Sequence, residues 1–375
     1  MTMLRGIPCV LMRGGSSKGV FFLASSLPGV EALRDRALLA AMGSPDVRQI
    51  DGLGGGDDQS SKVVLVAPSQ RPGIDVEYLF AQVSVSRDLV DVTPNSGNMA
   101  AGVAPFAIEQ GLVAAGDPVT LVRIFNLNTG KVLLAEVQTP GGQITYKGDY
   151  QLDGVPGTSS PVILTFLDPA GGKTGEMLPT GAPLNVVDGV RVSCVDFTNP
   201  LVFVAAGDVG KSGHESKQEL DADIEVRERL EQIRRRAGLL MGMGDVEGKG
   251  LPKMALLARP RHGGQIASRY FVPETCHAAH ALTGALCLAA ACNIPGTLAA
   301  QIANPNADAL ERLVIEHPSG HVETRCSIEG RTRAGLPIIS RASVVTSARP
   351  LFTGTVYIRD FVAMESARSP SARCA

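Results

Sequence analysis

An internal duplication constrains the fold of this chain more than any other feature of its sequence. Four segments recur in the same order at spacings of 182 to 191 residues, nearly half of the 375-residue length. MRGGSSKGVFFL matches VDFTNPLVFVAA with Val20 opposite Val202, and SSKVVLVAP matches LPKMALLARP with Lys62 opposite Lys253. The other two pairs are SGNMAAGVAPFAI with TGALCLAAACNI, and NTGKVLLAEV with PSGHVETRCSI. Self-similarity at a fixed spacing indicates repeated structural units, so we expect two copies of one domain.

We place the two copies at residues 1–183 and 184–365, and the last strand of the second copy is a candidate to return to the first domain. The final residues, 366–375, are rich in Ser, Ala and Arg, a composition typical of a disordered tail. Within each copy, short β-rich apolar runs such as KVVLVAP and YLFAQVSV are bounded by Gly, Pro and Ser and predict strands. Helical segments interrupt these strands. The fold class that we expect is therefore α+β with a duplicated domain.

Four helices are predicted with some detail. Residues 29–43 follow Ser26 and Pro28 and stop at a glycine, as helix start and stop signals require. Residues 221–242 alternate apolar and charged side chains at helical spacing, which predicts an amphipathic helix exposed on one side. The helices after Ser96 and after Thr283 are apolar on most faces. We expect both to be buried, each wrapped by its own mixed sheet.

The first turn of each buried helix carries a hydroxyl followed by glycine: Ser96 with Gly97, and Thr283 with Gly284. A hydroxyl caps unpaired N–H groups, and a glycine allows a ligand to approach the backbone. Two such ends facing one cleft would form an anion site for carboxylate or phosphate, because N–H groups and helix dipole both favour negative charge. The alternative is that both hydroxyls are helix caps and nothing more.

Composition excludes several classes of protein. The net charge is −2, Trp is absent and aromatic residues make up 4% of the chain, so neither a basic surface nor stacking platforms suggest nucleic acid as a partner. The most apolar run, ALCLAAACNI, has half of the ~20 residues that a membrane span needs. No signal peptide is recognisable, and the seven cysteines are scattered without a Cys-x-x-Cys pair. These features predict a cytoplasmic protein with reduced thiols and no membrane partner.

Three motif-like features carry no function. GLGGGDDQSSK lacks the Gly-Lys-Ser/Thr end of a phosphate-binding loop, and Pro94 occupies the place of the first glycine of a nucleophile elbow. Cys276, His277 and His280 contain a candidate metal pair, but no further ligand is obvious in the sequence. We therefore expect no metal site.

Three long motifs, IPCVLMRGGSSKGVFF, GSPDVRQIDGLGGGDDQSSK and NSGNMAAGVAPFAIEQGL, resemble the PrpF family of isomerases, relatives of diaminopimelate epimerase. The resemblance spans nearly the whole chain. It implies two similar domains, each a curled mixed sheet around a central helix, with the active site between them and no cofactor. Family members shift a double bond by 1,3-proton transfer in di- and tricarboxylates such as 2-methylaconitate, aconitate and 4-oxalomesaconate. The segment IDGLGGGD is most similar to 4-oxalomesaconate tautomerases of gallate and protocatechuate degradation.

The resemblance also implies the catalytic positions. The family lysine falls on Lys62, and the family cysteine falls on Ser96. A serine hydroxyl titrates too high to replace a thiol unaided. Either the lysine is the only strong acid–base group, or the serine is an engineered replacement of a cysteine. A lysine beside the apolar VVLV run should have a lowered pKa and act as the base.

Substrate-binding candidates offer N–H groups, hydroxyls or a guanidinium to a carboxylate. They are Ser16, Ser17, Asn95, Gly97, Asn98, Arg269, Thr283, Gly284, Ser319 and Gly320. The expected function is therefore a cofactor-independent isomerase of a small unsaturated tricarboxylate. The alternatives are a 2-methylaconitate or aconitate isomerase and, in another class, a carboxylate-binding protein without catalysis. A homodimer is one candidate oligomeric state.

Overall fold

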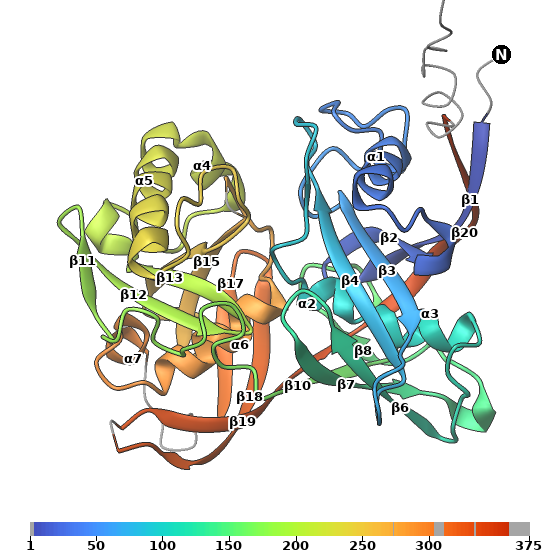
Figure 1. Cartoon of the computed structure of the whole chain (residues 1–375). Helices are drawn as coiled ribbons and strands as arrows, with labels where there is room; N and C mark the ends of the chain where they lie inside the picture. The colour runs from blue at the N-terminus through green and yellow to red at the C-terminus, as the bar shows by residue number, and fades with distance from the viewer. Residues whose placement is uncertain (1–3, 273, 304–310, 334, 360–375) are drawn as a thin grey trace, which may run out of the picture.

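The computed structural model describes residues 4–272, 274–303, 311–333 and 335–359, which form two lobes joined by strands (Figure 1). The strands of the first lobe are β1 (Leu4–Gly14), β2 (Ser17–Leu23), β3 (Lys62–Pro68), β4 (Val76–Val83), β5 (Val90–Asp91), β6 (Val119–Asn126), β7 (Lys131–Gln138), β8 (Tyr150–Gln151), β9 (Thr158–Ser159) and β10 (Val162–Leu167). The strands that follow are β11 (Asn185–Val187), β12 (Val190–Phe197), β13 (Asn199–Ala205), β14 (Lys253–Ala258), β15 (Ile266–Val272), β16 (Thr275–Cys276), β17 (Arg312–His317), β18 (Gly320–Arg331), β19 (Pro337–Thr346) and β20 (Ala348–Arg359).

The order of hydrogen-bonded strands confirms the duplication. It runs β20-β1-β2-β3-β4-β6-β7-β10 in the first lobe and β11-β12-β13-β14-β15-β17-β18-β19 in the second. The same two steps are parallel in both lobes, β2–β3 with β4–β6, and β13–β14 with β15–β17. Lys62 pairs with Gly19 as Lys253 pairs with Leu201, so the aligned lysines share one register.

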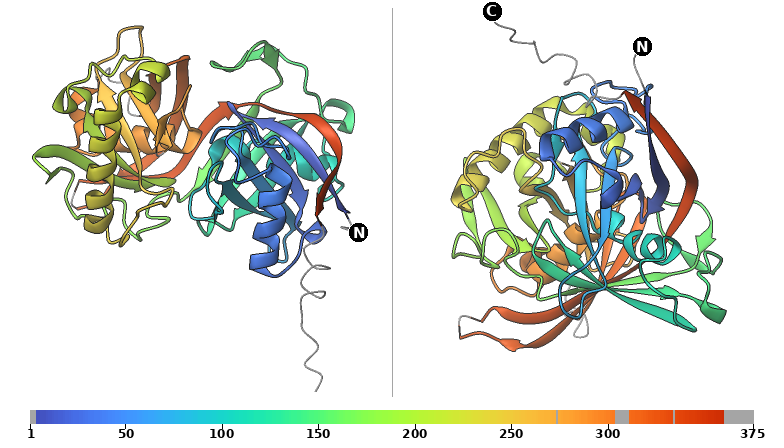
Figure 2. Two further views of the ribbon diagram at one scale, coloured as in Figure 1. Left: turned by 90° about the horizontal axis from the view of Figure 1, so that it is seen from above. Right: turned by 45° about the vertical axis from the view of Figure 1, so that its right-hand side comes forward.

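Two strands link the lobes. β10 pairs with β19 in antiparallel fashion where the two sheets meet. β20 then continues into the first lobe, where it pairs along β1 from Leu4 opposite Arg359 to Gly14 opposite Ala348 (Figure 2). The domain boundary at residues 183 and 184 stays a prediction, and residues 366–375 lie outside the described part.

Helices lie on both faces of the curled sheets. They are α1 (Glu31–Met42), α2 (Gly97–Ala100), α3 (Val103–Glu109), α4 (Lys217–Ala222), α5 (Ile224–Leu240), α6 (Leu282–Cys292) and α7 (Leu298–Ile302). α1 packs Leu38 and Met42 against the outer face of the first sheet, and α5 packs Leu230 and Ile233 against that of the second. α3 and α6 belong to the core inside the sheets. The α+β fold with two similar domains, each curled around a buried helix, is confirmed.

The helix predictions hold with two corrections: α5 begins at Ile224 rather than at residue 221, and the helix after Ser96 is interrupted. α1 ends as expected at Gly43, which adopts a left-handed conformation with φ 76°, and α5 begins after Asp223, whose side chain accepts from Val226 N. The buried helix after Ser96 is not continuous, because it divides into α2 and α3 around Gly102. Pro105 has no N–H to donate to Ala101, so the helical ladder lacks one bond there.

In the described ranges, no helix combines the length and the apolar character needed to cross a membrane. The six cysteines in these ranges are free thiols, and Cys374 lies outside them.

Candidate active site

Lys62 is a buried cation at the first position of β3. Its side chain is 7% exposed, its Nζ donates to Gln82 Oε1 at 2.6 Å, and it lies 5.3 Å from the centroid of the Phe80 ring. Burial, together with the positive charge of Lys253, lowers the pKa of Lys62 to about 8, while the negative charge of Asp58 opposes the shift. No carboxylate in the described ranges lies within ion-pair distance. A substantial neutral fraction near pH 8 suits Lys62 to work as a general base.

Lys253 occupies the equivalent position at the start of β14 and is 8% exposed. Burial also lowers the pKa of Lys253 to about 8, while Asp58 and Asp91 oppose the shift. The sequence alignment of the two halves matched Lys253 with Lys62, but it did not lead us to expect Lys253 in the site. The repeat itself was the available signal.

The ends of the two buried helices meet, but their hydroxyls have different roles. Ser96 is the N-cap of α2, and its side chain accepts from Met99 N at 3.3 Å. Thr283 is not a cap, because α6 begins at Leu282 after Ala281. The expectation of a matching cap was therefore wrong for Thr283. Its Oγ1 instead accepts from Asn199 Nδ2 at 3.1 Å, and the residue is fully buried.

Packing requires glycine at these two helix ends, Gly97 and Gly284. A Cβ on Gly97 would lie 2.9 Å from Leu282 Cβ and 3.1 Å from Thr283 N, so it would push α2 away from α6. A Cβ on Gly284 would meet the ring of Tyr270 at 2.3 Å. Tight packing between segments of this chain therefore requires both glycines. The sequence had instead suggested that a ligand approaches the backbone closely at these positions.

Asn199 holds the two halves together at this point. Its Nδ2 donates to Asn95 O at 2.9 Å as well as to Thr283, and its Oδ1 accepts from Asn95 N at 3.3 Å. Asn199 was missed as a site residue although it lies in the repeated segment, at the position that corresponds to Ser17. The structure thus joins Asn95 and Thr283, two residues that the sequence singled out separately.

Asn98 contacts two serines, Ser16 and Ser17, of the first hairpin. Its Nδ2 lies 3.3 Å from both Ser16 Oγ and Ser17 Oγ, while its buried Oδ1 has no partner in the described ranges. Ser16 and Ser17 line a cavity of about 360 Å³ together with Gly154.

Ser319 and Gly320 reach the first lobe from the β17–β18 hairpin. A Cβ on Gly154 would meet the Ser319 side chain at 3.3 Å, and one on Gly320 would meet Asp153 at 2.1 Å. Ser319 Oγ donates to Ala278 O. These contacts bring the hairpin of the second lobe to the segment beside the Ser16 and Ser17 cavity.

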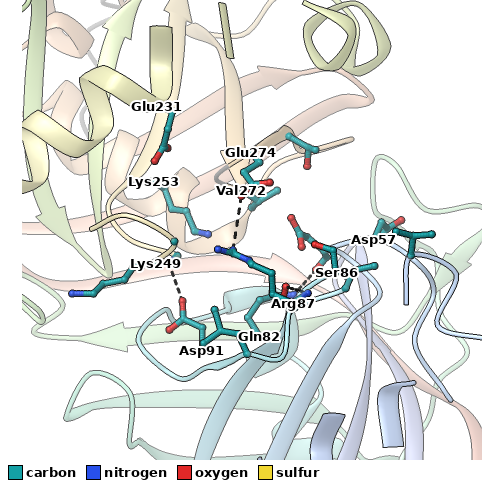
Figure 3. A pocket seen from close by; sticks show the side chains of 18 of the residues that line it. Asp57, Gln82, Ser86, Arg87, Asp91, Glu231, Lys249, Lys253, Val272 and Glu274 are labelled. Carbon is teal, nitrogen blue, oxygen red and sulfur yellow. Dashed lines mark hydrogen bonds and ion pairs between the residues drawn. The ribbon is translucent and has the colours of Figure 1, made fainter. Parts of the chain in front are cut away.

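A second cavity, which we call the interlobe cavity, has a volume of about 350 Å³. The first lobe contributes Asp58, Gln82 and Asp91 to its wall, and the second lobe contributes Arg234, Lys253 and Thr275. Figure 3 shows Gln82, Asp91 and Lys253. The lobes touch beside the cavity, where Gly250 N donates to Asp91 Oδ2 at 2.8 Å. Because Gln82 also accepts from Lys62, the buried lysine is one side chain away from this cavity.

Arg269 does not join the other candidates. Tyr270, its neighbour on β15, packs inward against α6, so strand alternation turns Arg269 to the opposite face. There its Nε donates to Glu215 O at 2.6 Å and its Nη1 to Ser268 O at 3.1 Å. The geometry thus gives Arg269 a role in holding the segment before α4.

The histidines of CHAAH are buried and neutral. Burial lowers the pKa of His280 to about 3 and that of His277 well below its usual value. Neutral His280 donates from Nδ1 to Ala281 O at 2.9 Å, which leaves its Nε2 to accept from Ser268 Oγ at 3.0 Å. In the described ranges, no group of three or more His, Cys, Asp or Glu side chains is placed to hold a metal ion.

Comparison with known proteins gives consistent matches. Residues 3–359 match the family model described as PrpF protein. The chain is 47% identical over 352 residues to 4-oxalomesaconate tautomerase of Pseudomonas putida, covering 94% of this chain and 96% of that one. It is 48% identical over 351 residues to (4E)-oxalomesaconate Delta-isomerase of a Novosphingobium species, covering 94% and 97%.

Solved structures agree on the fold. Methylitaconate-delta-isomerase superposes with a TM-score of 0.75 at 35% identity, over 99% of both chains. A hydroxyproline epimerase from Agrobacterium vitis superposes with a TM-score of 0.57 at 13% identity, over 96% of this chain and 95% of the other. The second likeness concerns the fold alone.

Proposed function

The chain belongs to the PrpF family and is an isomerase, and we propose that it moves a C=C bond of a small unsaturated tricarboxylate by a 1,3-allylic proton shift. We propose 4-oxalomesaconate as the substrate, because the two relatives at 47% and 48% identity carry that compound in their names. No cofactor is needed for a proton shift of this kind when the carbanion formed is stabilised as a dienolate.

The proposal rests mainly on the burial of Lys62, its lowered pKa and its amide partner. Lys62 is a buried lysine with a pKa of about 8, held by a neutral amide rather than a carboxylate. A lysine paired with a carboxylate would stay protonated and could not remove a proton at neutral pH. Lys62 is free of that restraint.

In the proposed mechanism, neutral Lys62 removes the allylic proton of the bound substrate. The electron pair of the broken C–H bond moves into the conjugated system, and the resulting ammonium returns a proton to the far carbon. Helix N-termini at α2 and α6 favour the negative charge of the dienolate. Ser96, beside the first turn of α2, is the second proposed catalytic residue.

For substrate binding we propose Ser16, Ser17, Asn95, Gly97, Asn98, Thr283, Gly284, Ser319 and Gly320. Asn98 and the two serines supply donors beside one cavity. Arg269 stands apart for the geometric reason given above.

A turnover screen over 4-oxalomesaconate, 2-methylaconitate and aconitate tests the proposal, with product formation followed by proton NMR. We expect 4-oxalomesaconate to give the highest kcat/KM. A higher value for one of the other two would replace the substrate. Tight binding of all three without any turnover would instead identify a carboxylate-binding protein.

A further inference from the structure

The ammonium group of Lys253 faces the interlobe cavity without a protein partner. Figure 3 shows its side chain reaching from the second lobe toward the space in which Gln82 and Asp91 of the first lobe lie. In the part of the chain that the structure describes, no hydrogen-bond acceptor or carboxylate lies within bonding distance of Lys253 Nζ. Because an unpaired buried charge is costly, this arrangement indicates an anionic ligand.

Three other cations around the cavity, Arg234, Arg87 and Lys217, are already engaged. Arg234 donates from Nε to Glu231 at 2.6 Å, from Nη1 to Leu251 O at 3.1 Å and from Nη2 to Val246 O at 2.8 Å. Arg87 lies 3.9 Å from Glu274, and Lys217 pairs with Asp221.

Lys249 differs from Lys253 although both line the cavity. Lys249 is exposed, and its side chain extends away from Lys253 (Figure 3). Among these cations, Lys253 is therefore the one whose charge is both buried and available to a ligand.

The location of Lys253 connects it with the proposed base. Lys62 and Lys253 start equivalent strands of the two lobes, and Gln82 both lines the cavity and accepts from Lys62 Nζ. We propose that Lys253 binds one carboxylate of the substrate in the interlobe cavity and thereby selects tricarboxylates over dicarboxylates. This inference rests on the proposed function and adds the residue that determines its specificity.

Protonation is consistent with that role. With a pKa of about 8, Lys253 is mostly an ammonium ion at pH 7, and a bound carboxylate would favour its charged form further. Asp58 and Asp91 lie near enough to act on it through charge. Lys253 thus contributes a cation where the substrate arrives, while Lys62 contributes a base.

Binding of saturated analogues tests the inference without turnover. Isothermal titration calorimetry compares tricarballylate with glutarate and methylsuccinate, which each lack one of its carboxylates. We expect the wild type to prefer tricarballylate by about 10- to 100-fold, the range that one charge-assisted hydrogen bond supplies. Lys253→Met should reduce this preference to within about threefold. Lys249→Met, which removes the same charge from the cavity rim, should retain the wild-type ratio.

Equal melting temperatures of the variants establish that folding is intact, and Lys253→Gln replaces Lys253→Met should the latter unfold. A preference that survives both substitutions, or a wild type that has none, contradicts the inference. Absence of turnover with every tricarboxylate, together with a Lys253-dependent preference, would refute the proposed function and leave this inference standing.

Discussion

Lys62 and Lys253 are two buried lysines, and the charge of Lys253 acts on Lys62. The positive charge of Lys253 is the second-largest cause, after burial, of the lowered pKa of Lys62. A base must be neutral to accept a proton, so the activity of this site should depend on that pKa.

The first prediction concerns this pH dependence. We expect kcat of the wild type to rise with pH through a midpoint above 8, because deprotonation of Lys62 produces the active form and the carboxylates of the bound substrate raise its pKa above the value of about 8 in the free protein. Lys253→Met removes a like charge, which favours the ammonium form of Lys62 and moves the midpoint to higher pH. Steady-state rates at saturating substrate from pH 6 to 10 provide the measurement. A midpoint that stays in place or falls would contradict the coupling.

Some residues of the candidate site could be identified from the sequence, and others could not. Lys62 and Ser96 could be selected because they lie within motifs that resemble a family. Asn199 could not, since its importance comes from bonds to Asn95 and Thr283, which lie 104 and 84 residues away. Lys253 was visible as a repeat partner, but its unpaired ammonium is a property of the folded cavity.

At the scale of elements, packing between α2 and α6 fixes the distance between the N-termini of these two helices. The sequence predicted both helices from their apolar patterns, and it predicted α1 with its glycine stop. It did not predict the break at Gly102, although Pro105 was a readable signal. It also placed Thr283 at a cap position, because capping depends on a backbone conformation that Ala281 adopts here.

The second prediction tests that contact. Gly97→Ala places a methyl group 2.9 Å from Leu282 Cβ, so α2 must move away from α6. Overpacking of this kind costs about 1–3 kcal/mol of unfolding free energy, and kcat should fall because the helix ends separate. Gly29→Ala is the matched control, since its Cβ would meet nothing within 4 Å. Denaturant unfolding and steady-state kinetics measure both variants, and a Gly97→Ala protein equal to the control would refute the packing argument.

For the whole molecule, the duplicated sequence predicted the architecture well. The matched segments occupy equivalent strands and helices, because each half repeats one pattern of parallel and antiparallel pairs. The sequence led us to expect a site between the two domains but not the lining of the interlobe cavity, since Asp58, Asp91 and Lys253 come from distant segments and meet only after both lobes have folded.

The third prediction concerns β20, which completes the first lobe with residues from the end of the chain. A stop after Ser347 removes β20 and leaves β1 with an unpaired edge. We expect this variant to melt at a lower temperature and to aggregate, because exposed edges pair with other chains. A stop after Glu365 removes only the predicted disordered tail and serves as the control. Equal melting temperatures for the two truncations would contradict the structural role of β20.

The central claim is that Lys62 is the base of a 1,3-proton shift. Proton NMR in heavy water measures it directly, with wild type and Lys62→Met on 4-oxalomesaconate and with folding checked by circular dichroism. We predict deuterium in the product of the wild type, because lysine exchanges its protons with solvent. The variant should lose turnover and exchange together by about 10²- to 10⁴-fold, the usual contribution of a general base. A folded Lys62→Met protein that isomerises the substrate at a rate near that of the wild type would contradict the claim.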